Sequence, residues 1–233
     1  MFEAVLPRGK TLKDIFNGLK ELITDHVNVD VSTDGIKLQA MDSSHVSMVC
    51  LDMTVDCFTV FRCDQQQMTL GLNMKSVTQI LKLCGNDDTV TLSCDDDPQR
   101  LTFKFESGED RVSEFEMNLM EIDAEHLGIP DTDFQAEITM ASKEFASTKG
   151  KVAFGVTSVE GNVGHGNMLF KHNPYAEKNP VKYFAKSSPL NEEVKLGLHL
   201  DQPLVVQFNL DEKKANLGSL KYFLAPKIND DDQ

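Results

Sequence analysis

The sequence contains VTLSC at residues 90–94 and LTFKF at 101–105, two runs in which apolar and polar side chains alternate. The same alternation returns in the second half, as VKLGL at 194–198 and LVVQF at 204–208. Strict alternation is typical of strands that bury one face, and the short separation within each pair favours a hairpin. Because the strand pair recurs in both halves, the sequence predicts a duplicated domain.

Outward from these strands, the first half reads as further strands with two amphipathic helices. Apolar residues three and four apart between Leu12 and Ile23 predict the first helix, with Thr11 as its cap, and Asn73 is expected to cap the second. A run of antiparallel strands with few helices indicates the α+β class. The other elements expected are helices over 74–83 and from 142 onward, and strands at 27–31, 36–40, 46–52, 57–63, 68–72, 112–118 and 136–140.

We expect two similar domains, residues 1–117 and 135–233, joined by a connector at 118–134. The connector is acidic, contains Gly128 and Pro130, and sustains no apolar helical face. Such a segment favours an extended linker.

The second domain is short for a repeat. In the first half, 25 positions from Lys10 through Asp34 hold a helix, a strand and a turn, whereas the matching piece from Lys143 to Lys149 has seven. We therefore expect that helix and strand segments are missing from the second domain, with breaks near 145–149 and within about 171–183.

The composition is that of an acidic globular protein. Lys and Arg number 23 against 37 Asp and Glu, for a net charge of −14. This balance excludes a simple basic nucleic-acid binder, although it allows one positive face on an acidic body. No run approaches the roughly 20 apolar residues of a membrane span, and the N-terminus is too short and acidic for a secretory signal. We expect a soluble intracellular protein.

No catalytic or metal signature occurs in a fitting context. The five cysteines include no CxxC pair, and the six histidines form no HExxH. The aspartates at 95–97 precede Pro98 between two expected strands, which is more typical of a solvated turn than of a magnesium site. The glycine-rich run at 161–166 lacks the strand–helix setting of a nucleotide loop. We expect no enzyme, no metal and no cofactor.

Lysines line the solvent face of both first-half helices. Lys13 and Lys20 share a stripe that Lys10 extends, and Lys75 and Lys82 share a face on the second helix. Lysines at helix spacing suit sequence-independent contact with phosphates. The alternative is an ordinary solvated helix face.

Four separated motifs resemble the eukaryotic DNA sliding clamps, the proliferating cell nuclear antigen family, and they keep the family's order along the chain. They are MFEA at 1–4, MDSSHV at 41–46, LGIP at 127–130 and LKYFLAPKI at 220–228. The resemblance implies N-terminal and C-terminal clamp domains of antiparallel sheet with helices on one face, in a ring formed by a homotrimer.

The resemblance also implies a role without catalysis. Such a ring encircles double-stranded DNA in the nucleus and tethers DNA polymerase, the clamp loader and other replication and repair factors. A subunit of a related heterotrimeric checkpoint clamp is the alternative.

Three sets of functional residues follow from the resemblance. An apolar pocket for a short partner motif is implied at Met41, His45, Val46, Leu127, Ile129, Pro130, Pro203, Phe223, Ala225 and Pro226. DNA-facing lysines are implied at Lys10, Lys13, Lys20, Lys75, Lys82 and Lys186. Edge strands at the subunit interface are implied at Val112, Phe115, Met117, Asn167, Met168 and Leu169.

Lys149 falls near the family's ubiquitin-accepting lysine, although the sequence around it is one residue shorter than the family's pattern. An ordinary turn lysine is the alternative.

Overall fold

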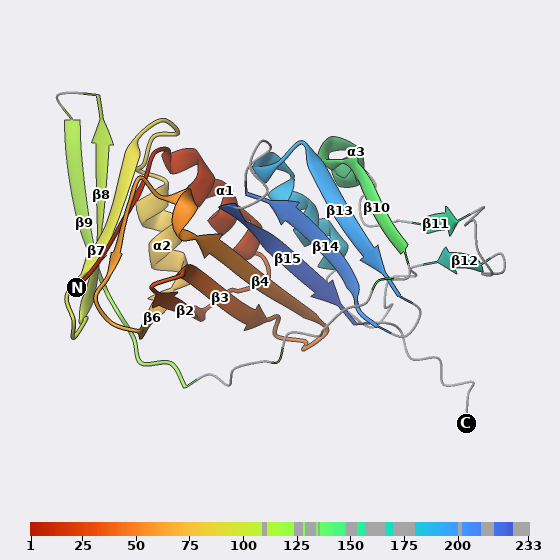
Figure 1. Cartoon of the computed structure of the whole chain (residues 1–233), viewed down its shortest axis with the longest axis horizontal. Helices are drawn as coiled ribbons and strands as arrows, with labels where there is room; N and C mark the ends of the chain where they lie inside the picture. Colours follow the sequence, from red (N-terminus) through yellow and green to blue (C-terminus); the bar gives the residue numbers. More distant parts are fainter. Residues whose placement is uncertain are drawn as a thin grey trace.

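The computed structural model (Figure 1) describes residues 1–108, 111–123, 128, 134, 136–147, 153–156, 166–169, 180–199, 202–210 and 217–225. These residues form two large antiparallel sheets, one small sheet and a few short helices. The predicted α+β class is confirmed.

A five-stranded sheet belongs wholly to the first half, in the order β5-β1-β7-β8-β9. The expected hairpin of β7 and β8 is confirmed, and Leu92 lies opposite Phe103 with both side chains buried. Alternate residues of these strands enter the core, as the sequence pattern predicted. The strands are β1 (Phe2–Leu6), β5 (Val60–Cys63), β7 (Thr89–Cys94), β8 (Arg100–Ser107) and β9 (Arg111–Asn118).

An eight-stranded sheet runs through both halves, in the order β10-β13-β14-β15-β4-β3-β2-β6. The two halves meet where β15 pairs with β4, from Gly218 opposite Met53 to Leu224 opposite Ser47. One continuous hydrogen-bonded sheet therefore joins the halves (Figure 1). The strands are β2 (His26–Ser32), β3 (Gly35–Met41), β4 (Ser47–Thr54), β6 (Gln67–Asn73), β10 (Ala136–Ala141), β13 (Glu193–Leu198), β14 (Leu204–Asn209) and β15 (Gly218–Leu224).

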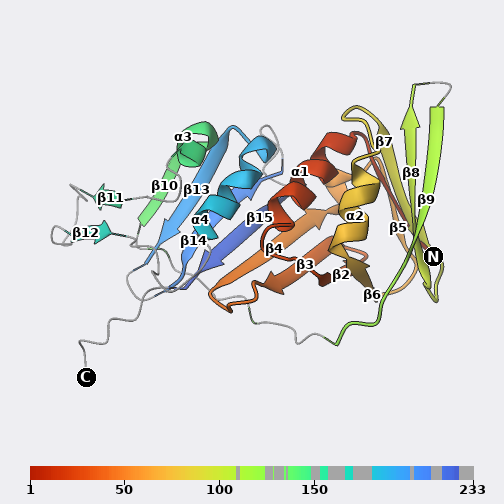
Figure 2. The ribbon, with the colours of Figure 1, turned by 180° about the vertical axis from the view of Figure 1, so that it is seen from behind.

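The helices lie on one side of the eight-stranded sheet, as Figure 2 shows from behind. A third, two-stranded sheet pairs β11 (Ala153–Val156) with β12 (Gly166–Leu169). The helices are α1 (Gly9–Leu19), α2 (Met74–Leu81), α3 (Ser142–Ser147) and α4 (Pro180–Phe184), with 3-10 turns η1 (Val55–Cys57) and η2 (Ala185–Leu190).

Helix α1 starts earlier than predicted, and Thr11 is not its cap. Arg8 occupies the cap position without a side-chain hydrogen bond. The first backbone N–H groups are satisfied from elsewhere in the fold, because Gly9 N donates to Asp88 O at 2.7 Å and Lys10 N to Asn86 O at 2.9 Å. Tertiary acceptors replace the capping side chain that helix starts usually need.

Helix α2 begins as the sequence predicted. The Oδ1 atom of Asn73 accepts a hydrogen bond from Ser76 N at 3.0 Å, which caps the helix. Beside it, the start of the connector is held on the edge of β6, where Met120 N donates to Gly71 O at 3.0 Å.

The second half repeats the first with shorter helices. Strands β10, β13, β14 and β15 follow one another as β1, β7, β8 and β9 do, and α3 has 6 residues where α1 has 11. Helices α3 and α4 with η2 still cover the sheet of this half, which is therefore not left bare (Figure 2). Residues 148–149 of the first expected break and 171–179 of the second lie outside the described residues, so the missing segments stay a prediction.

Candidate functional site

A single carboxylate shapes the turn between β3 and β4. Asp42 Oδ1 accepts hydrogen bonds from Val46 N at 2.9 Å and Ser47 N at 2.8 Å, and Oδ2 accepts from Ser44 N and Ser44 Oγ. His45 takes a left-handed backbone conformation with φ 56°, which a residue other than glycine adopts only where its surroundings support it. The turn leaves the side chains of Met41 and His45 exposed and that of Val46 half-buried.

The last strand lies against this turn. Ala225 N donates to Val46 O at 3.0 Å, directly after the pairing of Leu224 with Ser47. Leu224 also pairs with Leu204 of β14, which Pro203 precedes. The structure thus brings together Met41, His45, Val46, Pro203, Phe223 and Ala225, from three distant parts of the sequence, at one end of β3, β4, β14 and β15.

Phe223 is more buried than expected, since its side chain is only 4% exposed. It lies between Met48 and Val205 in a row across three strands and joins Cys50 in a small apolar cluster separate from the main core. A residue that lines a pocket for a partner is expected to be partly exposed, and for Phe223 this expectation is wrong. A ring in the middle of a sheet row is covered by its cross-strand neighbours.

Phe134, near the end of the connector, packs against the same cluster. A Cβ atom on Gly197 would overlap the Phe134 ring, with Cζ only 2.5 Å away. Gly197 therefore makes room for the ring on β13. Sequence reasoning missed Phe134, although a glycine inside the alternating run VKLGL is a signal of close approach by another group.

Cys50 contributes an apolar side chain to the Phe223 cluster rather than a reactive group. Burial raises the pKa of its thiol to about 11, against a smaller opposing effect of Lys221. The thiol is neutral near pH 7, and a neutral buried thiol behaves as a small hydrophobic group. Cys50 therefore adds apolar area to the cluster and not a reactive thiolate.

Four of the predicted pocket residues, Leu127, Ile129, Pro130 and Pro226, lie outside the described residues, as does Lys149. We name the surface formed by Met41, His45, Val46, Pro203 and Ala225, beneath which Phe223 is buried, the turn surface.

The six predicted lysines of the helical side differ in their surroundings. Lys10 Nζ forms an ion pair with Asp14 at 2.5 Å, and Lys20 Nζ donates to Asn17. Lys13 Nζ donates to Cys84 O and to Asn86 Oδ1, both at 2.9 Å, so it ties α1 to the segment that follows α2. Lys13 is thus largely a structural residue.

The remaining three lysines of this set, Lys75, Lys82 and Lys186, are exposed. Within the described part of the chain they form no ion pair. Two further exposed lysines lie on the second-half helices, Lys143 on α3 and Lys182 on α4. Lone cations on the side of the molecule that carries the helices suit loose contact with an anionic polymer.

Strand β9 ends the five-stranded sheet with an edge that no described strand covers. Along it Val112 is 58% exposed, Phe115 is half-buried and Met117 is buried. The other predicted interface residues, Asn167, Met168 and Leu169, lie in β12, which pairs with β11 and not with β9. The two predicted interface strands are therefore not paired with each other within one chain.

The described residues contain no group of three or more side chains suited to hold a metal ion. None of the described helices is long and apolar enough to cross a membrane.

A family model described as "Proliferating cell nuclear antigen, N-terminal domain" matches residues 1–126. This match covers more than half of the chain, from β1 through β9 into the connector. Sliding clamps of this family are scaffolds rather than enzymes. The matched span, the α+β fold and the two antiparallel sheets agree, and the chain belongs to the proliferating cell nuclear antigen family of sliding clamps.

Proposed function

We propose that this protein is a DNA sliding clamp, a homotrimeric ring that encircles duplex DNA in the nucleus and tethers DNA polymerase as a processivity factor. Family membership supports the general role. The pairing of β15 with β4 is the single observation that carries the ring.

The ring is inferred by repeating this kind of strand pairing between the second half of one chain and the first half of the next. Strand β15 ends the second half as β9 ends the first, and β15 completes its sheet on β4 of the other half. Strand β12 follows β11 as β4 follows β3, so β9 would pair with β12 of the next copy. Each chain then contributes two repeats, and in a closed ring of three chains every β9 edge would be paired with a neighbour, as in symmetric assemblies.

The exposed lysines would face the hole of such a ring. Because Lys75, Lys82 and Lys186 can meet phosphates but no base edges, contact with DNA would be independent of sequence and weakened by salt. The ring itself, rather than affinity, would keep the protein on DNA.

The turn surface would take the partners. A short motif with aliphatic and aromatic side chains gains about 1.5–3 kcal/mol for each side chain that it buries. Two or three such side chains give binding weak enough for the polymerase, the clamp loader and repair factors to replace one another.

Light scattering on the purified chain tests the ring. A mass three times the 26.0 kDa of one chain is expected. A monomer at micromolar concentration would contradict the homotrimer, and a ring that forms only with unlike subunits would favour a checkpoint clamp. A second test loads the protein on DNA, where retention on circles and loss from linear ends is expected.

A further inference from the structure

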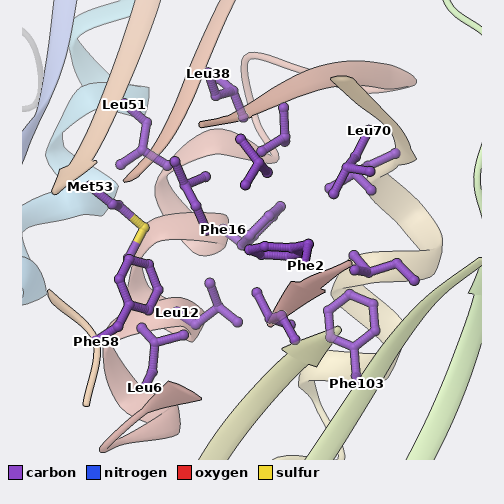
Figure 3. Close-up of a pocket in the computed structure, with 16 residues that line it drawn as sticks. Phe2, Leu6, Leu12, Phe16, Leu38, Leu51, Met53, Phe58, Leu70 and Phe103 are labelled. Atoms are coloured by element: carbon purple, nitrogen blue, oxygen red, sulfur yellow. The ribbon is translucent and has the colours of Figure 1, made fainter. Parts of the chain in front are cut away.

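A small void lies in the core of the first half, between α1 and the two large sheets (Figure 3). Its volume is about 40 Å³. Phe2 and Phe103 reach it from the five-stranded sheet, Leu38 and Leu70 from the eight-stranded sheet, and Leu12 from α1. All 16 lining residues are apolar and buried.

The lining decides what the void can hold. A space of this size exceeds the roughly 10–15 Å³ that one water needs, yet a buried water also needs two to four polar partners. No polar surface faces the void, so water there would lose its hydrogen bonds. The lining atoms in turn lack neighbours on one side and forgo dispersion attraction.

We propose that this void is a binding site for a small apolar molecule, such as a noble gas or a hydrocarbon of one or two carbons. A ligand of this class restores the missing dispersion contacts and gives up no hydrogen bonds. Aromatic ligands are too large, because an engineered cavity that accepts benzene measures about 150 Å³. The site lies in the core of the first half, away from the turn surface, and does not depend on the proposed clamp function.

Xenon is the probe that tests the proposal. The full-length protein, labelled with ¹³C in its methyl groups, is titrated with dissolved xenon. Saturable shifts are expected for the methyl groups of Leu12, Leu38 and Leu70. The methyl groups of Leu196 and Val206, in the core of the second half, are expected to respond only weakly and linearly. Benzene added together with xenon should leave the saturable xenon-induced shifts unchanged, because it is too large to compete for the void. Absence of saturation at the lining residues would overturn the proposal.

A matched pair of substitutions locates the site. Val31 lines the void and Val49 does not, and the two are 0% and 1% exposed in strands of the same sheet. Val31→Ile adds one methylene where space is free, so it should keep or raise the melting temperature and abolish the xenon response. Val49→Ile overpacks its site, so it should lower the melting temperature and retain the response.

Two results would contradict this assignment. An equal loss of melting temperature in both variants would mean that no free space lies beside Val31. An unchanged xenon response in Val31→Ile would place the ligand elsewhere.

Discussion

The hydroxyl oxygen of Tyr222 lies 2.6 Å from the Oγ of Ser187, and both residues are fully buried. This hydrogen bond joins β15 to η2, and the Phe184 ring stacks on Tyr222 with centroids 4.5 Å apart. Gly18 of α1 packs against the same two hydroxyls. The shared sheet and the helices of both halves therefore meet at one polar contact inside an apolar core.

Removal of either hydroxyl should destabilise the protein. Tyr222→Phe leaves Ser187 Oγ buried without a partner, at a cost of about 1–3 kcal/mol. The double variant with Ser187→Ala should cost clearly less than the sum of the single changes, because neither group is then left unpaired. Urea unfolding of the four proteins measures the coupling, and additive losses would show that the bond contributes nothing.

Gly18→Ala should destabilise the protein although alanine is the better helix former. The helix gains about 0.5–1 kcal/mol from the change, but a Cβ at this position would overlap Ser187 Oγ and lie 2.8 Å from Tyr222 Oη. Overpacking of this kind costs about 1–3 kcal/mol. Thermal unfolding measures the balance. Ser187→Gly is itself destabilising, but in that background Gly18→Ala should cost less than in the unaltered protein, and an equal cost in both would place the strain elsewhere.

Lys75→Glu with Lys82→Glu should weaken the affinity for duplex DNA and spare the fold. Each lost phosphate contact lowers the slope of log K against log salt concentration by about 0.9. The matched control is Lys37→Glu with Lys195→Glu, which makes the same charge change on exposed strand positions away from the helices. The affinity of both double variants for duplex DNA is measured as a function of salt concentration. An equal loss of affinity in the two variants would disprove the role of the helical face.

Asp42→Ala should loosen the turn surface. Val46 N and Ser47 N lose their acceptor, at a cost of about 1–2 kcal/mol, and the melting temperature should fall by about 2–8 °C. Asp42→Asn retains one carbonyl oxygen as an acceptor, so its melting temperature should lie between those of the unaltered protein and Asp42→Ala. Calorimetry with a peptide carrying the clamp-binding motif should show the weakest binding in Asp42→Ala and intermediate binding in Asp42→Asn. An unchanged affinity in Asp42→Ala would show that the turn does not contribute to peptide binding.

Stability should fall above about pH 9. Burial raises the pKa of Cys50, Cys84 and Cys94 from 9.0 to about 11, so the unfolded chain loses these protons first. The stabilisation is complete below pH 9 and is lost as the pH rises towards 11, by up to about 1.4 kcal/mol per pH unit for each thiol. Urea unfolding measures the free energy of unfolding across this pH range. In a variant with Cys50, Cys84 and Cys94 replaced by alanine, this free energy should depend less on pH.

Alternation made the strands predictable, because burial of one face imposes a period of two on the sequence. The cap of α2 was predictable for a similar reason, since Asn73 is adjacent to the N–H groups that it satisfies. The start of α1 was not, because its acceptors, Asp88 O and Asn86 O, come from a distant loop.

The candidate site was predictable mainly through resemblance. The motif MDSSHV marked the turn, although the sequence analysis did not identify Asp42 as the acceptor of the turn's hydrogen bonds. The burial of Phe223 depends on Met48 and Val205 in neighbouring strands, and strand neighbours are a property of topology rather than of the segment itself.

The pairing of β15 with β4 also has a consequence for synthesis of the protein. Strand β4 ends at Thr54 and β15 begins only at Gly218, so β4 leaves the ribosome long before its neighbour has been made. At about 5–20 residues per second, the edge of β4 waits on the order of ten seconds or more without its neighbour. The nascent first half is therefore exposed to mispairing with other chains, and a chaperone that shields this edge during translation would raise the yield of folded protein.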